Sequence, residues 1–305
     1  MACRSRNSHR GGHHSMLTSR APAKVNLYLH VGPAQPNGRH PLDSLVVFAG
    51  PEAADLVTAE AAENLSFSVS GPRGKGMEAD ASNLVLRAAE ALNAAAGTQH
   101  GARLHLEKHL PVAAGIGGGS ADAGAALRLL TELWEADAAL AKGIAPRLGG
   151  DVPVALIGCT ALMQGEGERV SPVSGLPKLP AILVNPALDC PTGPIFRAYD
   201  EAGGGDGFRE VSRLPEFVDA PALIDWLRDQ RNDLQEPAIL NVPAIATVLE
   251  TLSGLEGARL VRMSGSGATC FALFETQDTA KAAEAVVCQA QPDWWVRATM
   301  LGDAR

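Results

Sequence analysis

The sequence predicts an α+β protein with two domains, each of which folds strands and helices around its own core. A chain of 305 residues is long enough for two domains, and 46% apolar and 20% charged residues are ordinary for a globular protein. Strand-like and helix-like segments are mixed along the chain. We place the boundary near Gly158, which gives domains over residues 17–158 and 159–305 after a disordered extension over residues 1–16.

Alternation of apolar and polar residues predicts the strands of the first domain. They are expected over residues 23–31, 45–48 and 65–69, and around Leu104 and Leu106. The first strand is interpreted as half-buried, with a polar face made of Lys24, Asn26, Tyr28 and His30.

Apolar residues at helical spacing predict three helices in the same domain. They are expected over residues 83–96 with Ser82 as N-cap, over residues 121–133 with Ser120 as N-cap, and over residues 137–147, followed by Gly149 and Gly150.

The second domain is expected to have a similar mixture of elements. Strands are predicted over residues 161–163 and 181–184, and on either side of Gly265-Ser266-Gly267; helices are predicted over residues 221–231, 243–252 and 280–289. The glycine tract at residues 203–207 is typical of a flexible surface loop.

Composition excludes several classes of function. A net charge of −8 and an aromatic content of 4% argue against nucleic-acid binding. The chain contains no run of eighteen apolar residues, so no membrane span is predicted. Five scattered cysteines favour reduced thiols in a cytoplasmic protein. The arginine-rich start is interpreted as an extension, with a transit peptide or a metal-binding tract of His9, His13 and His14 as alternatives.

Residues 111–121 form a glycine-rich loop directly before a helical segment. Glycines let the backbone approach a ligand closely, and the N–H groups at the start of a helix attract phosphate oxygens. No Gly-Lys-Ser/Thr follows, and Ser120 stands where a dinucleotide-binding loop would have its third glycine. The loop therefore predicts a phosphate site of neither common type.

Lys24 and Asp151 are the strongest candidates for catalysis. Taken alone, Lys24 is more often a solvated strand residue and Asp151 a turn or capping residue. Together with the glycine loop, they supply what a kinase needs. These are a carboxylate to accept the proton of an attacking hydroxyl, a cation to offset phosphoryl charge, and a backbone cradle for the nucleotide.

Three further features have both a functional and a structural interpretation. Gly265-Ser266-Gly267 is a second small-residue loop that permits close approach to a ligand or to the first loop, or is simply a tight turn. His40 is equally compatible with ligand binding and with exposure. Phe196 is either a stacking surface or part of a minor core.

Three segments, at residues 21–27, 115–122 and 263–271, resemble the signature motifs of the superfamily of galactokinase, homoserine kinase, mevalonate kinase and phosphomevalonate kinase. The resemblance covers about residues 17–302. It implies a small-molecule kinase fold with an N-terminal ribosomal-protein-S5-like α/β domain, which binds nucleotide and substrate, and a C-terminal ferredoxin-like domain. The active site is expected between them.

Within that superfamily, Gly150-Asp-Val-Pro-Val and Asn232-Asp-Leu resemble one branch in particular. Its members use ATP to phosphorylate the 2-hydroxyl of 4-(cytidine 5′-diphospho)-2-C-methyl-D-erythritol, on the non-mevalonate route to isoprenoid precursors. The alternatives are another alcohol kinase of the superfamily, of the homoserine or mevalonate type, or a catalytically silent nucleotide-binding sensor. We expect a cytoplasmic monomer or weak homodimer.

The resemblance also implies roles for individual residues. Lys24 and Asp151 match the catalytic pair, and ATP with Mg²⁺ is implied, although the protein ligands of the metal are not identified. The positions that match the nucleotide site are Pro111, Val112, Ala113, Ala114, Gly115, Ile116, Gly117, Gly118, Gly119, Ser120, Ala121, Lys108 and Asn83. Those expected to hold the substrate are Asn26, Arg39, His40, Phe196, Gly265, Ser266 and Gly267.

One position departs from the family pattern. Arg39 stands where relatives usually carry a tyrosine that is expected to stack on the cytosine. A guanidinium is planar and can also stack on a base, so Arg39 is predicted to replace the tyrosine by a cation–π contact.

Overall fold

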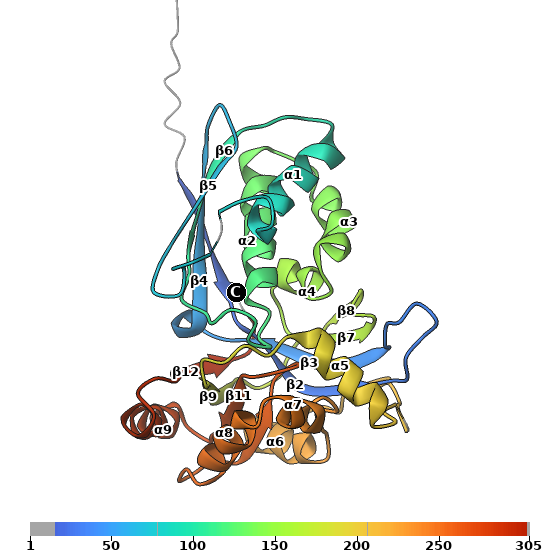
Figure 1. The fold of residues 1–305 in the computed structure, drawn as a ribbon, viewed down its shortest axis with the longest axis vertical. Helices are drawn as coiled ribbons and strands as arrows, with labels where there is room; N and C mark the ends of the chain where they lie inside the picture. The colour runs from blue at the N-terminus through green and yellow to red at the C-terminus, as the bar shows by residue number, and fades with distance from the viewer. Residues whose placement is uncertain (1–15, 78, 206, 304–305) are drawn as a thin grey trace, which may run out of the picture.

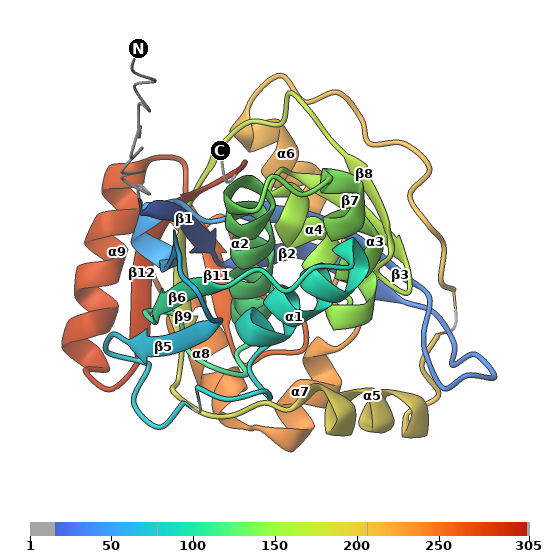
Figure 2. The ribbon, with the colours of Figure 1, turned by 90° about the horizontal axis from the view of Figure 1, so that it is seen from above.

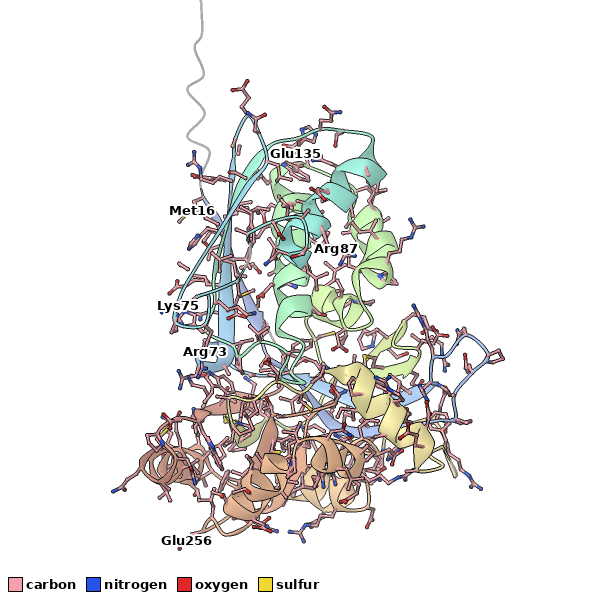
Figure 3. The ribbon with its side chains drawn as sticks, in the orientation of Figure 1. Met16, Arg73, Lys75, Arg87, Glu135 and Glu256 are labelled. Atoms are coloured by element: carbon pink, nitrogen blue, oxygen red, sulfur yellow. The ribbon has the colours of Figure 1, made fainter. Side chains whose placement is uncertain are left out.

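The strands of the computed structural model form three four-stranded sheets across the residues it describes, 16–77, 79–205 and 207–303. The N-terminal half and the C-terminal half lie at opposite ends of the long axis, with β2 (Lys24–Val31) and β3 (Leu42–Phe48) running between them (Figure 1). Glu135 lies near the end formed by the N-terminal half and Glu256 near the opposite end (Figure 3). Mixed strands and helices confirm the α+β class.

The first sheet has the order β1-β4-β6-β5 and is covered by helices on one face (Figure 1). Its strands are β1 (Leu17–Pro22), β4 (Ala54–Ala61), β5 (Ser66–Ser70) and β6 (Ala102–Glu107), with a short 3-10 helix, η1 (Pro51–Ala53), before β4. The covering helices are α1 (Leu84–Ala96), α2 (Gly118–Leu133), α3 (Ala138–Leu148) and α4 (Val152–Ile157). Apolar residues of α1 and α2 form one core with those of the sheet.

The second sheet contains β2, β3, β7 (Ala161–Gly165) and β8 (Arg169–Pro172), all paired antiparallel. The expectation that residues 161–163 belong to a second module is wrong, because β7 pairs directly with β3. This sheet therefore joins strands from both sides of residue 158.

β2 is buried along its whole length, so the expected half-buried strand with one polar face is wrong. Its register shifts between Asn26 and Tyr28, and a shift of one residue moves the following side chains to the other face. Leu27 and Tyr28 therefore share one apolar core, whereas Leu29 belongs to the next. Only Lys24 and Asn26 of the expected polar face line a cavity.

The third sheet has the order β10-β11-β9-β12 and both of its faces are covered (Figures 1 and 2). One face packs on β2, β3 and one helix of the C-terminal half, and the other packs on the remaining helices of that half. Its strands are β9 (Leu179–Asn185), β10 (Leu260–Met263), β11 (Cys270–Leu273) and β12 (Trp295–Leu301). The helices of this half are α5 (Thr192–Glu201), α6 (Ala220–Arg228), α7 (Gln235–Asn241), α8 (Ala244–Ser253) and α9 (Gln277–Ala290).

Both expected serine caps are wrong. Asn83 caps α1, since its side chain accepts a hydrogen bond from the N–H of Val85, and Gly117 precedes α2, which begins at Gly118. Sequence periodicity also did not predict β1, β4, β8, β12, α4, α5 and α7. Phe196 lies in α5 and not in a loop.

The expected extension over residues 1–16 lies outside the described residues except for Met16. Among those described, no helix combines the length and the apolar character needed to cross a membrane.

We expect Gly124→Ala to destabilise the protein, because α2 and α4 touch there through their backbones. A Cβ at Gly124 would lie 2.9 Å from the carbonyl carbon of Ala155 in α4. Overpacking of this kind costs about 1–3 kcal/mol in the free energy of unfolding. Gly143→Ala in α3 is the matched control, since a Cβ there meets nothing within 4 Å and should add up to about 1 kcal/mol through helix propensity.

Urea unfolding of both variants measures this difference. A Gly124→Ala variant that is as stable as Gly143→Ala would contradict the close contact between the two helices.

Candidate active site

Three segments that are far apart in the sequence meet through backbone contacts at the start of β2. The N–H of Lys24 donates to the carbonyl of Ile116 at 2.9 Å, and the N–H of Thr269 donates to the carbonyl of Ala114 at 3.1 Å. Ser264 joins the other two, because its Oγ accepts from the N–H of Asn26 at 3.1 Å and donates to the carbonyl of Gly115 at 3.3 Å. The three motif segments thus form one hydrogen-bonded unit.

Glycine is required where the two small-residue loops touch. A Cβ at Gly115 would lie 2.5 Å from the carbonyl oxygen of Gly267, and one at Gly265 would lie 2.6 Å from the carbonyl oxygen of Gly115. Both residues also have positive φ, of 72° and 59°. The second loop therefore makes the close approach to the first that its small residues allowed.

Lys24 and Asp151 form an ion pair at the centre of this unit. The Nζ of Lys24 lies 3.1 Å from Oδ2 of Asp151 and donates to Oδ1 of Asn26 at 2.7 Å. The lysine side chain is 6% exposed and the aspartate 30%, so the carboxylate is the member that faces the open space. Asp151 precedes α4 but caps nothing with its side chain, which leaves the carboxylate available.

Gly117 places the start of α2 against this pair. Its φ of 62° is in the left-handed region. A Cβ on it would lie 3.2 Å from Cε of Lys24 and 3.4 Å from Oδ2 of Asp151. The first N–H groups of α2 have no partner within the helix, so they are free to bind an anion beside the ion pair.

Two adjoining cavities open at this point. The smaller, of about 450 Å³, is lined by Lys24, Asn26, Asp151, Ser266 and the glycine loop. The larger, of about 1030 Å³, is lined by His40, Arg39, Arg147, Arg197 and neighbours. Phe196, Gly150 and Leu42 line both cavities, so the two are continuous around these residues.

Most residues expected at the nucleotide site line the smaller cavity, namely Ala113, Ala114, Gly115, Gly117, Gly118, Gly119 and Ser120. Four others, Pro111, Val112, Ile116 and Ala121, do not line it; Ile116 and Ala121 are packed in the apolar cores. Gly267 does not line the smaller cavity either, whereas Gly265 and Ser266 do.

Lys108 and Asn83, expected near the nucleotide, line neither cavity. The ammonium of Lys108 is buried and lies 2.6 Å from both Oδ2 of Asp55 and Oδ2 of Asp122. Asp55 also accepts the N–H groups of His109 and Leu110 at 2.5 and 2.8 Å. This cluster connects β4, residues 108–110 before the glycine loop, and α2 on the buried side of the loop.

The pKa of Asp122 is raised chiefly because the carboxyl is buried, and one ammonium neutralises only one of the two carboxylates. Burial raises that pKa from 3.8 to about 8; Lys108 opposes the shift and Asp55 adds to it. Oδ1 of Asp122 has no hydrogen-bond partner among the described residues. Burial lowers the pKa of Lys108, but the charges of Asp122 and Asp55 outweigh it and raise that pKa.

His40 and Phe196 come together on the wall of the larger cavity. Their rings lie 4.9 Å apart, and Nε2 of His40 is 2.7 Å from Oδ1 of Asp200. Nη1 of Arg39 is paired with Oε2 of Glu166 at 2.8 Å, and the arginine side chain is 71% exposed. Stacking of Arg39 on the base stays a prediction, because an ion pair at the edge of a guanidinium leaves its planar face uncovered.

Several lining residues were not predicted from the sequence. Thr192 at the start of α5 shares a hydrogen bond of 2.9 Å with Ser266, and Arg147 and Arg197 line the larger cavity. A single hydroxyl or arginine carries no motif, so sequence reasoning could not identify these residues. No group of three or more His, Cys, Asp or Glu side chains suited to a metal ion occurs in the described part of the chain.

Comparison with known proteins gives consistent matches. Family models for the GHMP kinases N terminal domain and the GHMP kinases C terminal match residues 83–159 and 218–293. A protein of Hyphomonas neptunium named 4-diphosphocytidyl-2-C-methyl-D-erythritol kinase is 59% identical, over 94% of this chain and 97% of its own. One of the same name from Caulobacter vibrioides is 44% identical, over 92% of this chain and 98% of its own.

Solved structures agree with these matches. A crystal structure of 4-(cytidine 5'-diphospho)-2C-methyl-D-erythritol kinase has a TM-score of 0.72 at 34% identity, over 94% of this chain and all of that chain. L. major mevalonate kinase, solved with R-mevalonate, has a TM-score of 0.64 at 15% identity, over 96% of this chain and 99% of that one, which shows a shared fold.

We expect Asp122→Asn to change how stability depends on pH. An acid with a raised folded-state pKa binds more protons in the folded state than in the unfolded state, between its two pKa values. The contribution of Asp122 to the free energy of unfolding of the natural protein therefore falls as pH rises from about 4 to about 8. The variant lacks the group, so its stability relative to the natural protein should increase across that window.

Urea unfolding of both proteins at several pH values measures the difference between their free energies of unfolding, which is the gap in stability. A gap that stays constant between pH 4 and 8 would show that Asp122 does not carry the raised pKa.

Proposed function

Because the chain belongs to the 4-diphosphocytidyl-2-C-methyl-D-erythritol kinases of the GHMP kinase family, we propose that it phosphorylates the 2-hydroxyl of 4-(cytidine 5′-diphospho)-2-C-methyl-D-erythritol with ATP. The family that the three sequence motifs indicated is confirmed, as is the two-domain kinase fold. ATP is the co-substrate that this family implies. The individual roles that follow are inferred from the geometry of the site.

The ion pair of Lys24 and Asp151 is the observation on which the proposal rests. It lies at the start of α2, where the γ-phosphoryl group would be bound, and its carboxylate faces the cavity. Asp151 would accept the proton of the acceptor hydroxyl as the oxygen–phosphorus bond forms and ADP leaves. Lys24 would hold the carboxylate in place and offset negative charge on the phosphoryl oxygens.

The glycine loop supplies the phosphate cradle. N–H groups at the start of α2 are unpaired within the helix and carry the positive end of its dipole. Gly117, Gly118 and Gly119 leave them uncovered by side chains. Such a preorganised set of donors stabilises charge on the phosphates without reorganisation during transfer.

Mg²⁺ fits this cavity by the chemistry of its donors. The Ser120 hydroxyl lines it, and oxygen ligands are those that Mg²⁺ prefers. The ion, carried on the phosphates of ATP, would neutralise the charge that moves to the leaving group.

The larger cavity is suited to the cytidine diphosphate end of the acceptor. His40 and Phe196 present adjacent rings there, and rings of this kind pack against bases. Arg147 and Arg197 line the same cavity, and neither has an ion-pair partner among the residues that the structure describes. They are positioned to offset the charge of a diphosphate.

The size of this second cavity favours the proposal over a kinase of the homoserine or mevalonate type. Those acceptors are small, whereas a cavity of about 1030 Å³ adjoins the one that holds the ion pair here. The ion pair of Lys24 and Asp151 argues against a catalytically silent sensor, because such a protein would not need a general base.

An acceptor panel tests the proposal. We expect phosphoryl transfer from radiolabelled ATP to the cytidine diphosphate acceptor, and far slower transfer to homoserine, to mevalonate and to the methylerythritol phosphate that lacks cytidine. Comparable transfer to the compound without cytidine would contradict the assignment of the larger cavity. No transfer to any member would favour the sensor.

We expect Asp151→Asn to lower kcat about 10²- to 10⁴-fold, which is the usual contribution of a general base. The amide keeps the shape of the carboxylate but cannot take the proton, so the affinity for ATP should change little. Asp225→Asn is the control, because Asp225 is an exposed carboxylate on α6 that lines neither cavity.

Steady-state kinetics and ATP titration separate the two effects. Turnover near the natural rate in Asp151→Asn would refute the assignment of the base, and a large loss of ATP affinity would indicate a role in binding instead.

A further inference from the structure

Two loops on the rim of the larger cavity are joined by a set of polar contacts. Glu166 lies in the turn between β7 and β8, and its Oε1 accepts from Nδ2 of Asn37 at 2.7 Å. Its Oε2 accepts from Nη1 of Arg39 at 2.8 Å. Oδ1 of Asn37 in turn accepts the N–H of Arg39 at 2.9 Å. Each oxygen of the Glu166 carboxylate therefore has its own donor from the loop between β2 and β3.

The turn that carries Glu166 is itself fixed next to the ion pair. The N–H of Glu166 donates to Oε2 of Glu168 at 2.6 Å, and the N–H of Gly167 donates to the carbonyl of Gln164 at 3.2 Å. A Cβ on Gly167 would lie 3.0 Å from the carbonyl oxygen of Gly150, the residue before Asp151. Glu166 thus extends from a turn that packs against the backbone of the reaction centre.

The other loop carries His40, which directly follows Arg39. Its backbone is closed by bonds of 2.7 Å from the N–H of Gln35 to the carbonyl of Arg39 and from the N–H of Gly32 to the carbonyl of Pro41. Holding Arg39 therefore holds His40 where its ring meets Phe196 across the cavity wall.

We propose that Asn37, Arg39 and Glu166 form a latch that fixes the loop of residues 32–41 over the larger cavity. In this role Arg39 is a positioning residue for the cytidine end of the acceptor, and it acts through Glu166 instead of stacking on the base. The proposal rests on the proposed function, because it assigns the larger cavity to the nucleoside diphosphate.

The charge state of the latch is stable at neutral pH. Hydrogen bonds from Asn37 and then from Arg39 hold the pKa of Glu166 below its ordinary value, so the carboxylate is ionised well below pH 7. Arg39 is 71% exposed and Glu166 27%. Exposed pairs contribute weakly, so the effect of the latch on acceptor binding should be a few-fold.

The test compares Glu166→Gln and Arg39→Gln. Each should raise the KM for the cytidine diphosphate acceptor about two- to fivefold, because opening the latch releases the loop with His40. The KM for ATP and kcat should not change. The double variant should be no worse than either single one, since both remove the same contact. Glu60→Gln is the matched control, because the pair of Glu60 and Arg103 has similar exposure and lies on the first sheet.

The outcomes separate the latch from stacking. If Arg39→Gln raises the acceptor KM while Glu166→Gln leaves it unchanged, Arg39 acts on the base directly and the latch is wrong. Unchanged KM in both variants also overturns it. The latch is also contradicted if kcat or the KM for ATP changes as much as the KM for the acceptor does.

Hydrogen exchange keeps the test independent of activity. In Glu166→Gln, amides of residues 33–40 should exchange faster than in the natural protein, with no change in α1. Equal exchange in that segment would exclude the latch even if the protein used another acceptor. Failure of the acceptor panel with faster exchange would instead refute only the proposed substrate.

Discussion

The structure depends on the close backbone contact between two glycine loops. Gly115 and Gly265 touch without space for a side chain on either, and Ser264 and Thr269 hydrogen-bond the same stretch. The first loop leads into α2 of the N-terminal half, and the second joins β10 to β11 of the C-terminal half. These contacts, with those of Lys24 and Asn26 to the same loops, fix the phosphate cradle, the start of β2 and the C-terminal sheet relative to one another.

The start of α2 lies between two lysine–carboxylate arrangements with different tasks. On the cavity side, Gly117 is next to Lys24 and Asp151, where the carboxylate faces open space. On the buried side, a Cβ on Gly118 would lie 3.2 Å from Nζ of Lys108, which both Asp55 and Asp122 hold. The first pair is available for chemistry. The second anchors the first turns of α2 to β4, so its effect on transfer is through position.

Sequence reasoning predicted the parts of the site that depend on motifs and local spacing. Lys24, Asp151 and the cavity-lining glycines were singled out because together they supply what a kinase needs and because they lie in motifs that resemble those of the family. What it missed depends on tertiary contacts. The register shift in β2 reverses the faces after Asn26, and β7 returns to pair with β3. The burial of Lys108 between two aspartates, one 53 residues earlier, leaves no local pattern. Glu166, the partner of Arg39, lies 127 residues away, so that pair leaves no local sequence pattern either.

In the proposed mechanism, one carboxylate, one ammonium and the start of α2 surround the reacting atoms. This arrangement can be observed in a crystal structure with a non-hydrolysable ATP analogue and the cytidine diphosphate acceptor. We expect the terminal phosphate to bind the N–H groups of residues 117–120, and the acceptor hydroxyl to lie within about 3.2 Å of the Asp151 carboxylate and to face that phosphate. A hydroxyl that contacts another base, or a phosphate bound away from α2, would contradict it.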